Sequence, residues 1–406
     1  MKVAIVGAGL AGLATALAFE QAGYEVHIFE SSNDIGGRMK TIMDDSHPID
    51  VGFHVLHTAY PSVHRWLDLA KLRPKPMAKC SLFFDKSNQT TERLGDGLAS
   101  PSHLLPTLRA IGFGDSLRLL RWRLSTRKNN LDKRKDEVQH SINKLLSSQG
   151  FSKKTERYLR ILFTGITLDP DLSDNAGFAH FTWSAMSHGS MVLLKDGIQS
   201  IPQQLRERLN HTTIHFNEPI LRIEETALFT QSQTFVADMV ILATPQHISH
   251  SFFQGTPVRG SMRTTKMFCF LSNAAPYTLP ALMLSSTWQK NQRSILHVNI
   301  PTLLHPRSDG KQMICATVIG EDTKHCDEHS VQSELVEWFG DEAKQWDFLR
   351  MTEVVDALPS SQPEKIALNP SKNVYVVGDH CIHGSVQGTL ESVERCLEAV
   401  GIPLPR

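Results

Sequence analysis

The stretch "KVAIVGAGLAG", residues 2–12, decides the fold of this chain. Residues 2–6 form a β-branched run without charge after Lys2, which is typical of a strand buried on both faces of a sheet. Gly7, Gly9 and Gly12 follow in the spacing G-x-G-x-x-G. The first glycine permits a tight turn, the second lets backbone approach a pyrophosphate, and the third lets a helix pack on the strand. The stretch predicts the start of a dinucleotide-binding fold.

The residues that follow complete this unit. An Ala- and Leu-rich segment, 11–22, stops at Gly23 and predicts a helix with a C-terminal glycine. A second strand over 24–29 delivers Glu30, whose carboxylate can accept hydrogen bonds from both hydroxyls of an adenosine ribose. A 2′-phosphate would be repelled there. NAD and FAD remain open at this point because both carry adenosine diphosphate.

A second glycine pair separates the two cofactors. Gly36 and Gly37 precede Arg38, which places two unobstructed amides and a fixed cation beside a pyrophosphate. With this pattern, a Glu, five residues and then Gly-Gly-Arg, the sequence resembles the flavin amine oxidase superfamily, which includes phytoene desaturases and protoporphyrinogen oxidases. The resemblance implies FAD, bound noncovalently, with Arg38 contacting its pyrophosphate.

The C-terminal stretch "VVGDHCIHGSVQG", 376–388, extends the resemblance. A buried strand over 374–377 leads to a turn, and a helix is predicted over about 385–400. The resemblance implies that Asp379, after Gly378, bonds a ribityl hydroxyl of FAD. It also implies that the amides near Val386 and Gln387 face the flavin ring, where a helix N-terminus stabilises the negative charge of reduced flavin.

The same resemblance assigns the remaining cofactor segments. Segments 212–225 and 235–248 supply further strands, and the stretch 49–61 passes the flavin ring. A packed, hydrogen-bonded histidine is the alternative for His54. The predicted cofactor-binding residues are Gly7, Gly9, Ala11, Gly12, Glu30, Gly36, Gly37, Arg38, Gly52, His54, Ile220 (through its backbone, to adenine), Ala243, Gly378, Asp379, Val386 and Gln387.

Two insertions interrupt these segments, which predicts an α/β protein with interleaved domains. A Rossmann-like FAD-binding domain of the glutathione-reductase type takes 1–70, 190–248 and 366–406, and an α+β substrate domain takes 71–189 and 249–365. The alternation in "RTTKMFCFLS", 263–272, predicts a strand with Lys266, Phe268 and Phe270 on one face. In amine oxidases of the resembling family a lysine on this sheet holds a water near the flavin N5. Lys266 is therefore a catalytic candidate beside His54, with a solvent-facing lysine as the alternative.

Composition limits the partners and the location. Lys plus Arg and Asp plus Glu both number 42, so no global field favours nucleic acid. Six scattered cysteines without a CxxC pair predict a reducing cytoplasm, and no zinc-ligand spacing predicts a metal. No apolar run reaches the roughly 20 residues of a spanning helix. The basic excess over 121–137 is typical of peripheral membrane contact, with a solvated helical face as the alternative.

Together these features predict an FAD-dependent oxidoreductase of the amine oxidase or desaturase type. It would remove a hydride from a C–N or C–C bond of a mostly apolar small molecule, and oxygen or another electron acceptor would reoxidise the flavin. Monoamine oxidases carry an aromatic cage residue where this chain has Ser385 to Gln387, which weakens the case for an amine. A redox-neutral flavin-dependent isomerase and a non-catalytic flavin-binding protein are the alternatives. The substrate and the oligomeric state stay open.

Overall fold

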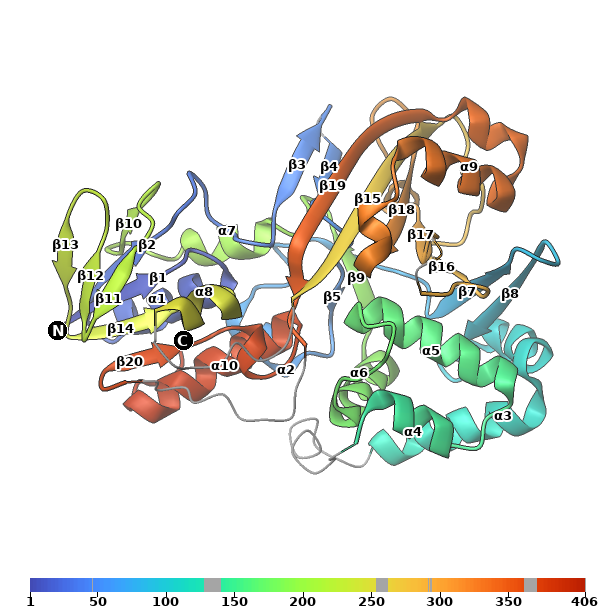
Figure 1. Ribbon diagram of the computed structural model, residues 1–406. Helices are drawn as coiled ribbons and strands as arrows, with labels where there is room; N and C mark the ends of the chain where they lie inside the picture. The colour runs from blue at the N-terminus through green and yellow to red at the C-terminus, as the bar shows by residue number, and fades with distance from the viewer. Residues whose placement is uncertain are drawn as a thin grey trace.

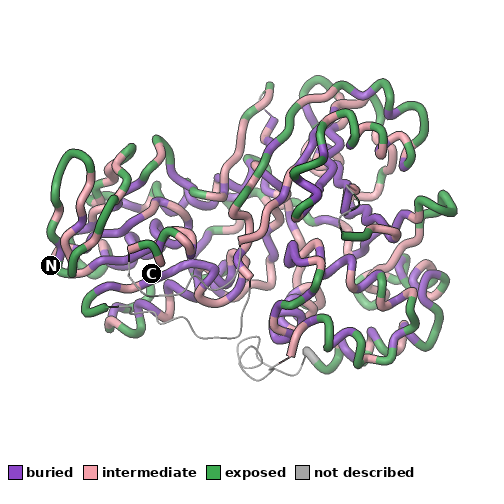
Figure 2. The backbone as a smooth tube through the Cα atoms, in the orientation of Figure 1, coloured by how far each residue is buried: buried purple, intermediate pink, exposed green. Residues whose placement is uncertain are grey.

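The computed structural model describes residues 1–45, 47–127, 140–252, 262–290, 292, 294–360 and 371–405. Figure 1 shows two parts, one with a parallel sheet that lies near both chain termini, and one with a larger sheet flanked by helices. In Figure 2 the buried residues run through the inside of both parts, while loop tips are exposed. Each part therefore has a core of its own.

The first part is built on a five-stranded parallel sheet in the order β10-β2-β1-β14-β20. Its strands are β1 (Lys2–Val6), β2 (Glu25–Phe29), β10 (Thr213–His215), β14 (Met239–Leu242) and β20 (Val374–Val376). Three distant stretches of sequence thus meet in one sheet. The segment predicted over 212–225 divides, because β11 (Arg222–Glu224) pairs instead with β12 (Ala227–Phe229), and β12 with β13 (Thr234–Val236), in a separate antiparallel sheet.

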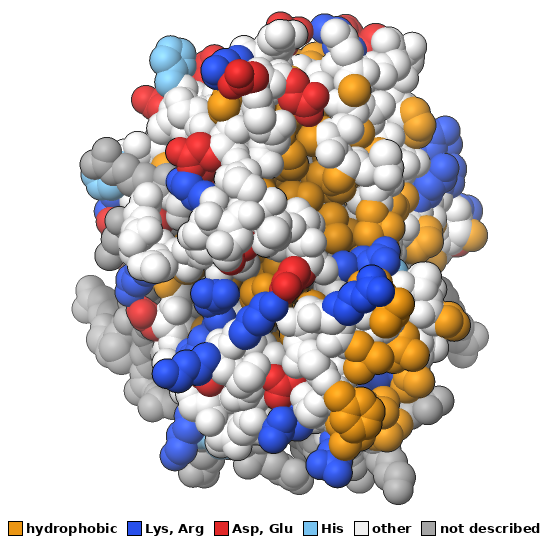
Figure 3. Space-filling model, turned by 90° about the vertical axis from the view of Figure 1, so that its right-hand side faces the viewer, with side chains coloured by type: hydrophobic (Ala, Val, Ile, Leu, Met, Phe, Trp, Pro, Cys, Tyr) orange, Lys and Arg blue, Asp and Glu red, His pale blue; other side chains and the backbone are white. Residues whose placement is uncertain are grey.

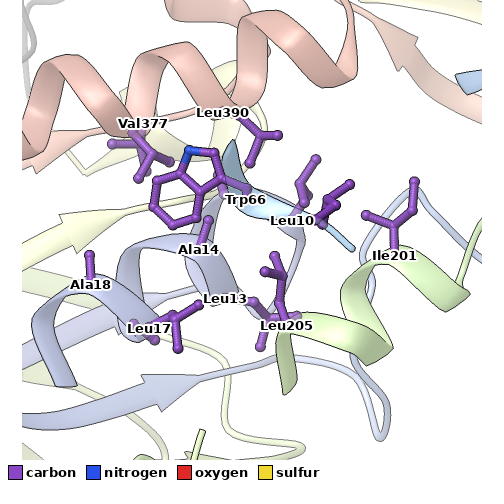
Figure 4. Packing of buried hydrophobic residues seen from close by; sticks show 14 of the residues in the cluster. Leu10, Leu13, Ala14, Leu17, Ala18, Trp66, Ile201, Leu205, Val377 and Leu390 are labelled. Atoms are coloured by element: carbon purple, nitrogen blue, oxygen red, sulfur yellow. The ribbon is translucent and has the colours of Figure 1, made fainter. Parts of the chain in front are cut away.

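Helix α1 (Leu10–Gln21) lies at the centre of this part's core. Its residues 10–19 are all buried, so no side of this stretch faces solvent, and most of them are small or aliphatic. Leu13 and Leu17 are fully buried, and Trp66 packs in the same cluster as Leu390. Figure 4 shows these side chains converging from several elements. The surrounding helices are α2 (Pro61–Trp66), α7 (Ser200–Arg206) and α10 (Val386–Val400).

The second part is built on a seven-stranded sheet in the order β19-β15-β18-β17-β16-β7-β8. Its strands are β7 (Cys80–Asp85), β8 (Thr90–Gly95), β15 (Arg263–Ser272), β16 (Leu282–Ser285), β17 (His297–Asn299), β18 (Gln312–Ile319) and β19 (Asp347–Leu358). Neighbours are antiparallel except for β16 and β7. Strands from both predicted insertions share this sheet.

Helices cover this sheet with two separate apolar clusters. One cluster joins Phe83 and Leu284 of the sheet to α3 (Leu104–Arg127), α4 (Ile142–Ser148), α5 (Lys153–Thr167) and α6 (Ala176–His188). The other joins Phe268 and Phe270 to α9 (Glu328–Phe339). The remaining elements are β3 (Thr41–Asp44), β4 (His47–Asp50), β5 (Leu56–His57), β6 (Pro74–Pro76), β9 (Met191–Leu194) and α8 (Gln246–Ser251). No described helix is long and apolar enough to span a bilayer.

Candidate cofactor and active site

In the glycine loop between β1 and α1, Gly7 and Gly12 have no room for a side chain. Gly7 has a φ of +102°, and a Cβ atom on it would lie 2.9 Å from the carbonyl oxygen of Ala243. A Cβ atom on Gly12 would lie 2.0 Å from the carbonyl oxygen of Gly7. Gly9 forms a parallel bridge with Gly36, so the structure brings the two glycine motifs together. Bare backbone at this point is what a pyrophosphate requires.

Glu30 lies at the carboxyl end of β2, beside the glycine loop, and is 8% exposed. One carboxylate oxygen accepts a hydrogen bond from the Ala8 amide at 2.7 Å. The other accepts from the Ser32 amide at 2.9 Å and from its hydroxyl at 2.8 Å. The Ser31 hydroxyl also donates to this second oxygen, at 3.3 Å, so the oxygen bonded to Ala8 is the one that can still accept a hydrogen bond from a ribose hydroxyl.

An ion pair between Arg38 and Asp379 connects the N-terminal segment of the chain with the C-terminal segment. The Arg38 guanidinium donates to both carboxylate oxygens of Asp379, at 2.7 and 2.8 Å, and to the Ala357 carbonyl oxygen at 2.9 Å. Burial raises the pKa of Asp379, but the charge of Arg38 outweighs it and holds that pKa well below its usual range. The pair is therefore fully charged at neutral pH. The N-terminal loop and the C-terminal turn are close enough to contact one shared molecule.

The start of α10 presents backbone groups at this junction. Gly378 has a φ of +148°, which favours glycine, and its amide donates to the Ser392 hydroxyl at 2.8 Å. Ser385 caps the helix by accepting from the Gly388 amide at 3.0 Å. The Gln387 side chain bonds Ser62 instead, at 2.9 Å. Any contact of Gln387 with a cofactor would therefore use its backbone.

The segment after β4 lies between the two parts. Gly52 has a φ of +85°, and its amide donates to the Thr352 hydroxyl of β19 at 3.1 Å. The His54 Nδ1 lies 3.3 Å from the Gly52 carbonyl oxygen. Burial lowers the pKa of His54, and the nearby Asp50 carboxylate only partly opposes this. His54 is consequently neutral, and it lines a cavity of about 40 Å³ with Met267.

Lys266 of β15 lies away from Gly52 and His54. Strand alternation puts Thr265 and Met267 on the face of β15 that meets the Gly52 segment, and Lys266 on the opposite face. The Lys266 ammonium pairs with the Glu353 carboxylate of β19 at 3.7 Å. Its face-mates Phe268 and Phe270 pack with α9 rather than lining either cavity described here. The structure does not bring Lys266 together with Gly52 and His54, and its catalytic role stays a prediction.

Three further predicted residues have supporting positions. Ala11 is buried in the first turn of α1. Ile220 lies between β10 and β11 and packs on the cluster that contains Val6 and Phe29. The Ala243 amide donates to the Val6 carbonyl oxygen at 2.9 Å, which ties the end of β14 to β1.

An aromatic group near the start of α10 was missed by sequence reasoning. The His383 ring lies 4.8 Å from Phe178 and 4.9 Å from Phe181, and Tyr60 stacks on Phe181 at 5.6 Å. Burial raises the pKa of Tyr60 to about 12, although a hydrogen bond with Ser385 opposes it. Phe178 and Phe181 belong to α6, and no spacing in the sequence relates α6 to α10.

A second cavity, of about 450 Å³, lies in the second part. Its walls come from β7 and β8, from α3 and α6, and from the short strands β5 and β9. Leucine, methionine and aromatic side chains dominate the lining, among them Phe83, Leu120, Leu162, Met186 and Met191. Its size and character are those of a pocket for an apolar small molecule.

His297 of β17 gives the fold a pH dependence. It is 3% exposed, and neither imidazole nitrogen has a hydrogen-bond partner among the described residues. Burial lowers its pKa from 6.5 to about 4. Between pH 6.5 and pH 4 this histidine is protonated in the unfolded chain but neutral in the folded protein. The free energy of unfolding is therefore unaffected by this group above pH 6.5 and decreases as the pH falls below that value.

When the pH falls from 7 to 5, the free energy of unfolding should decrease in the unaltered protein by about 2 kcal/mol more than in His297→Leu. Urea unfolding at both pH values measures this. His211→Leu, at an exposed position, is the control and should leave the pH dependence unchanged. An identical pH dependence in His297→Leu would assign the acid sensitivity to other groups.

Two sequence features lie partly or wholly apart from this site. Of the basic stretch 121–137, residues 128–137 fall outside the described residues, and 121–127 end α3. Within the described ranges, no group of three or more His, Cys, Asp or Glu side chains is placed to hold a metal. Neither "KHCDEH" nor "DHCIHG" forms such a group.

The parallel sheet, its glycine loop and the contact between Arg38 and Asp379 define a dinucleotide-binding fold, to which a second part with a seven-stranded sheet is joined. Residues 10–400 match the model of the flavin-containing amine oxidoreductases. The chain belongs to this family, and so to the flavin-dependent oxidoreductases.

Solved structures share the fold. An oxidoreductase from Methanosarcina mazei superposes with a TM-score of 0.77 at 18% identity, over 98% of this chain and 100% of the other. Cyclohexylamine oxidase from Brevibacterium oxydans gives 0.69 at 14% identity, over 98% of each chain. Zeta-carotene desaturase of Synechocystis is 48% identical over 61 residues, which are 15% of this chain and only 12% of that protein. At identities of 14 to 18% the solved structures show a shared fold, and the desaturase shares one segment of 61 residues. Neither likeness identifies a substrate.

Proposed function

We propose that this protein is an FAD-dependent oxidoreductase that takes a hydride from a C–N or C–C bond of a mostly apolar small molecule. The observation that carries the proposal is the contact between Arg38 and Asp379, which unites the N-terminal glycine loop with the turn before α10. A dinucleotide as long as FAD would contact both the glycine loop and the turn before α10. Family membership supports the class of reaction.

The residues at the crevice fit FAD. Gly7 and Gly12 let the loop and α1 pack closely against the backbone of Gly7 and Ala243, and Gly9 beside Gly36 leaves bare backbone for a pyrophosphate. Glu30 would accept from the ribose, Arg38 would neutralise pyrophosphate charge, and the free amides at the start of α10 would face the ring. When bound, FAD supplies the hydride acceptor. We propose noncovalent binding, which release of the flavin by acid precipitation would test.

The protein's own part in the reaction is binding, orientation and exclusion of water. The neutral His54 lies in the segment between the two parts, and the rings of Phe178, Phe181 and His383 pack together just before α10. The large cavity supplies apolar walls for a substrate. Oxygen or another acceptor would then receive the electrons.

Glu30→Arg tests the cofactor assignment. The unaltered protein should purify yellow, and Glu30→Arg should retain at least about tenfold less FAD, because a cation would replace the ribose acceptor. Flavin absorbance per protein, before and after dialysis, measures retention. Glu25→Arg, at an exposed position on the same strand, is the control. If the unaltered protein is colourless and does not take up added FAD, the proposal fails.

Two other functions use the same fold. A redox-neutral isomerase would turn over without oxygen and without net electron transfer, and a non-catalytic flavin-binding protein would not turn over at all. Anaerobic mixing with candidate substrates separates the three. Bleaching of the oxidised flavin absorbance on the enzymatic timescale of roughly 1 to 1000 per second supports the oxidoreductase.

A further inference from the structure

The charges along the large cavity do not balance. Arg123 and Asp96 both line the cavity and form an ion pair at 2.9 Å, so these two charges compensate. Lys79 also lines it, and the part of the chain that the structure describes offers its ammonium no carboxylate. The wall of an apolar cavity thus carries one uncompensated positive charge.

Lys79 is positioned by the strand it precedes. Its carbonyl oxygen accepts a hydrogen bond from the Asp96 amide at 3.0 Å, at the open end of the β7–β8 hairpin. The side chain is half-buried. Burial, together with the charge of Lys79, lowers the pKa of His57, another lining residue, to about 4. His57 is therefore neutral, and Lys79 and Arg123 are the lining cations.

The mouth of the cavity is apolar and open. Helix α3 breaks at Gly112, where φ is 75°, and the next residue, Phe113, is 75% exposed. Leu98 is 61% and Leu104 53% exposed, and all three side chains line the cavity. Figure 3 looks onto this end of the molecule and shows hydrophobic side chains gathered at the surface, with Lys and Arg beside them. An exposed apolar rim is typical of an entrance for an apolar ligand.

We propose that this cavity binds an elongated apolar molecule carrying one anionic group, and that Lys79 pairs with this anion. The apolar walls remove the body of the ligand from water, and an anion restores to Lys79 the electrostatic partner that the wall lacks. The proposal rests on the function proposed above only in identifying this molecule as the substrate.

The test compares laurate with dodecanol, which share a chain and differ in charge. Each displaces Nile red, a neutral apolar dye, from the full-length, FAD-loaded protein at neutral pH. We expect laurate to be effective at about tenfold lower concentration than dodecanol. Lys79→Gln should abolish this preference. Lys75→Gln, at an exposed position of β6, should keep it.

A third variant fixes the location. Leu117 of α3 lines the cavity, and Leu117→Trp should weaken both ligands about tenfold by filling it. Circular dichroism and flavin absorbance verify that each variant is folded. Equal displacement by both ligands, a preference that survives Lys79→Gln, or unchanged binding in Leu117→Trp would overturn the proposal. No turnover is measured, so a protein that binds FAD but oxidises no candidate substrate would refute the oxidoreductase without changing this result.

Discussion

Gly12→Ala is expected to cost about 3 kcal/mol of folding free energy and to yield protein without bound FAD. The added Cβ atom would lie 2.0 Å from the carbonyl oxygen of Gly7 and 3.4 Å from the Cβ atom of Ala243. Backbone cannot yield as a flexible side chain can, so α1 must move away from β1. Because α1 lies at the centre of the apolar cluster in Figure 4, that movement disturbs the whole first part.

Urea unfolding and flavin absorbance measure the two effects of Gly12→Ala. Gly165→Ala is the matched control, because Gly165 lies within helix α5 and a Cβ atom there would meet Leu296 at an ordinary 3.6 Å. Alanine in that helix should be neutral or stabilising by up to about 1 kcal/mol. A Gly12→Ala protein as stable and as yellow as the Gly165→Ala protein would mean that the loop does not pack as described.

Arg38→Ala is expected to abolish FAD retention and to cost about 3 kcal/mol. The Asp379 side chain is only 5% exposed, and without Arg38 its buried charge keeps only His380 as a cationic neighbour, with Nδ1 3.9 Å from the carboxylate. Burial raises the pKa of Asp379, and the variant lacks the Arg38 charge that most strongly opposes it, so the pKa of Asp379 should be higher in the variant than in the unaltered protein. In the unaltered protein the depressed pKa gives stability that is lost as the pH falls below about 4, and the variant should lose less stability from this group over the same range.

The double variant Arg38→Ala, Asp379→Asn separates charge from shape. Removing the buried carboxylate should recover part of the lost stability without restoring FAD, since the cation for the pyrophosphate is still missing. Arg65→Ala breaks an ion pair with Glu394 on the surface and should cost under about 1 kcal/mol. If Arg38→Ala retained FAD and behaved like Arg65→Ala, the joined chain ends would not be the cofactor site.

The two predictions concern groups of different origin. Gly12 acts through contacts within a single strand, loop and helix, which is why its role is visible in the sequence. The contribution of Arg38 to stability depends on its ion pair with Asp379, which lies 341 positions away in the chain. Only the arrangement of β1, β14 and β20 in one sheet brings the two together.

Local patterns in the sequence were sufficient for the elements themselves. The alternation over 263–272 predicted β15 with its observed bounds, and the helix predicted from about Ser385 is α10. Both follow from contacts between near neighbours in the chain, which depend on periodicity, glycine and capping residues. The segment 212–225 was predicted less well, because its second half pairs with a neighbouring hairpin rather than with β2.

The sequence by itself determined the class of fold, because the glycine loop, the acidic strand end and the Gly-Gly-Arg turn each depend on residues close together in the chain. Their cofactor-binding roles stay predictions. Only the tertiary structure decided which face of β15 meets Gly52, and it placed Thr265 and Met267 there rather than Lys266. It also formed the large cavity, which joins residues of the first insertion to His57 and Met191 of the short strands β5 and β9. A period of two defines two faces of a strand, but the elements packed on each face decide which one is covered.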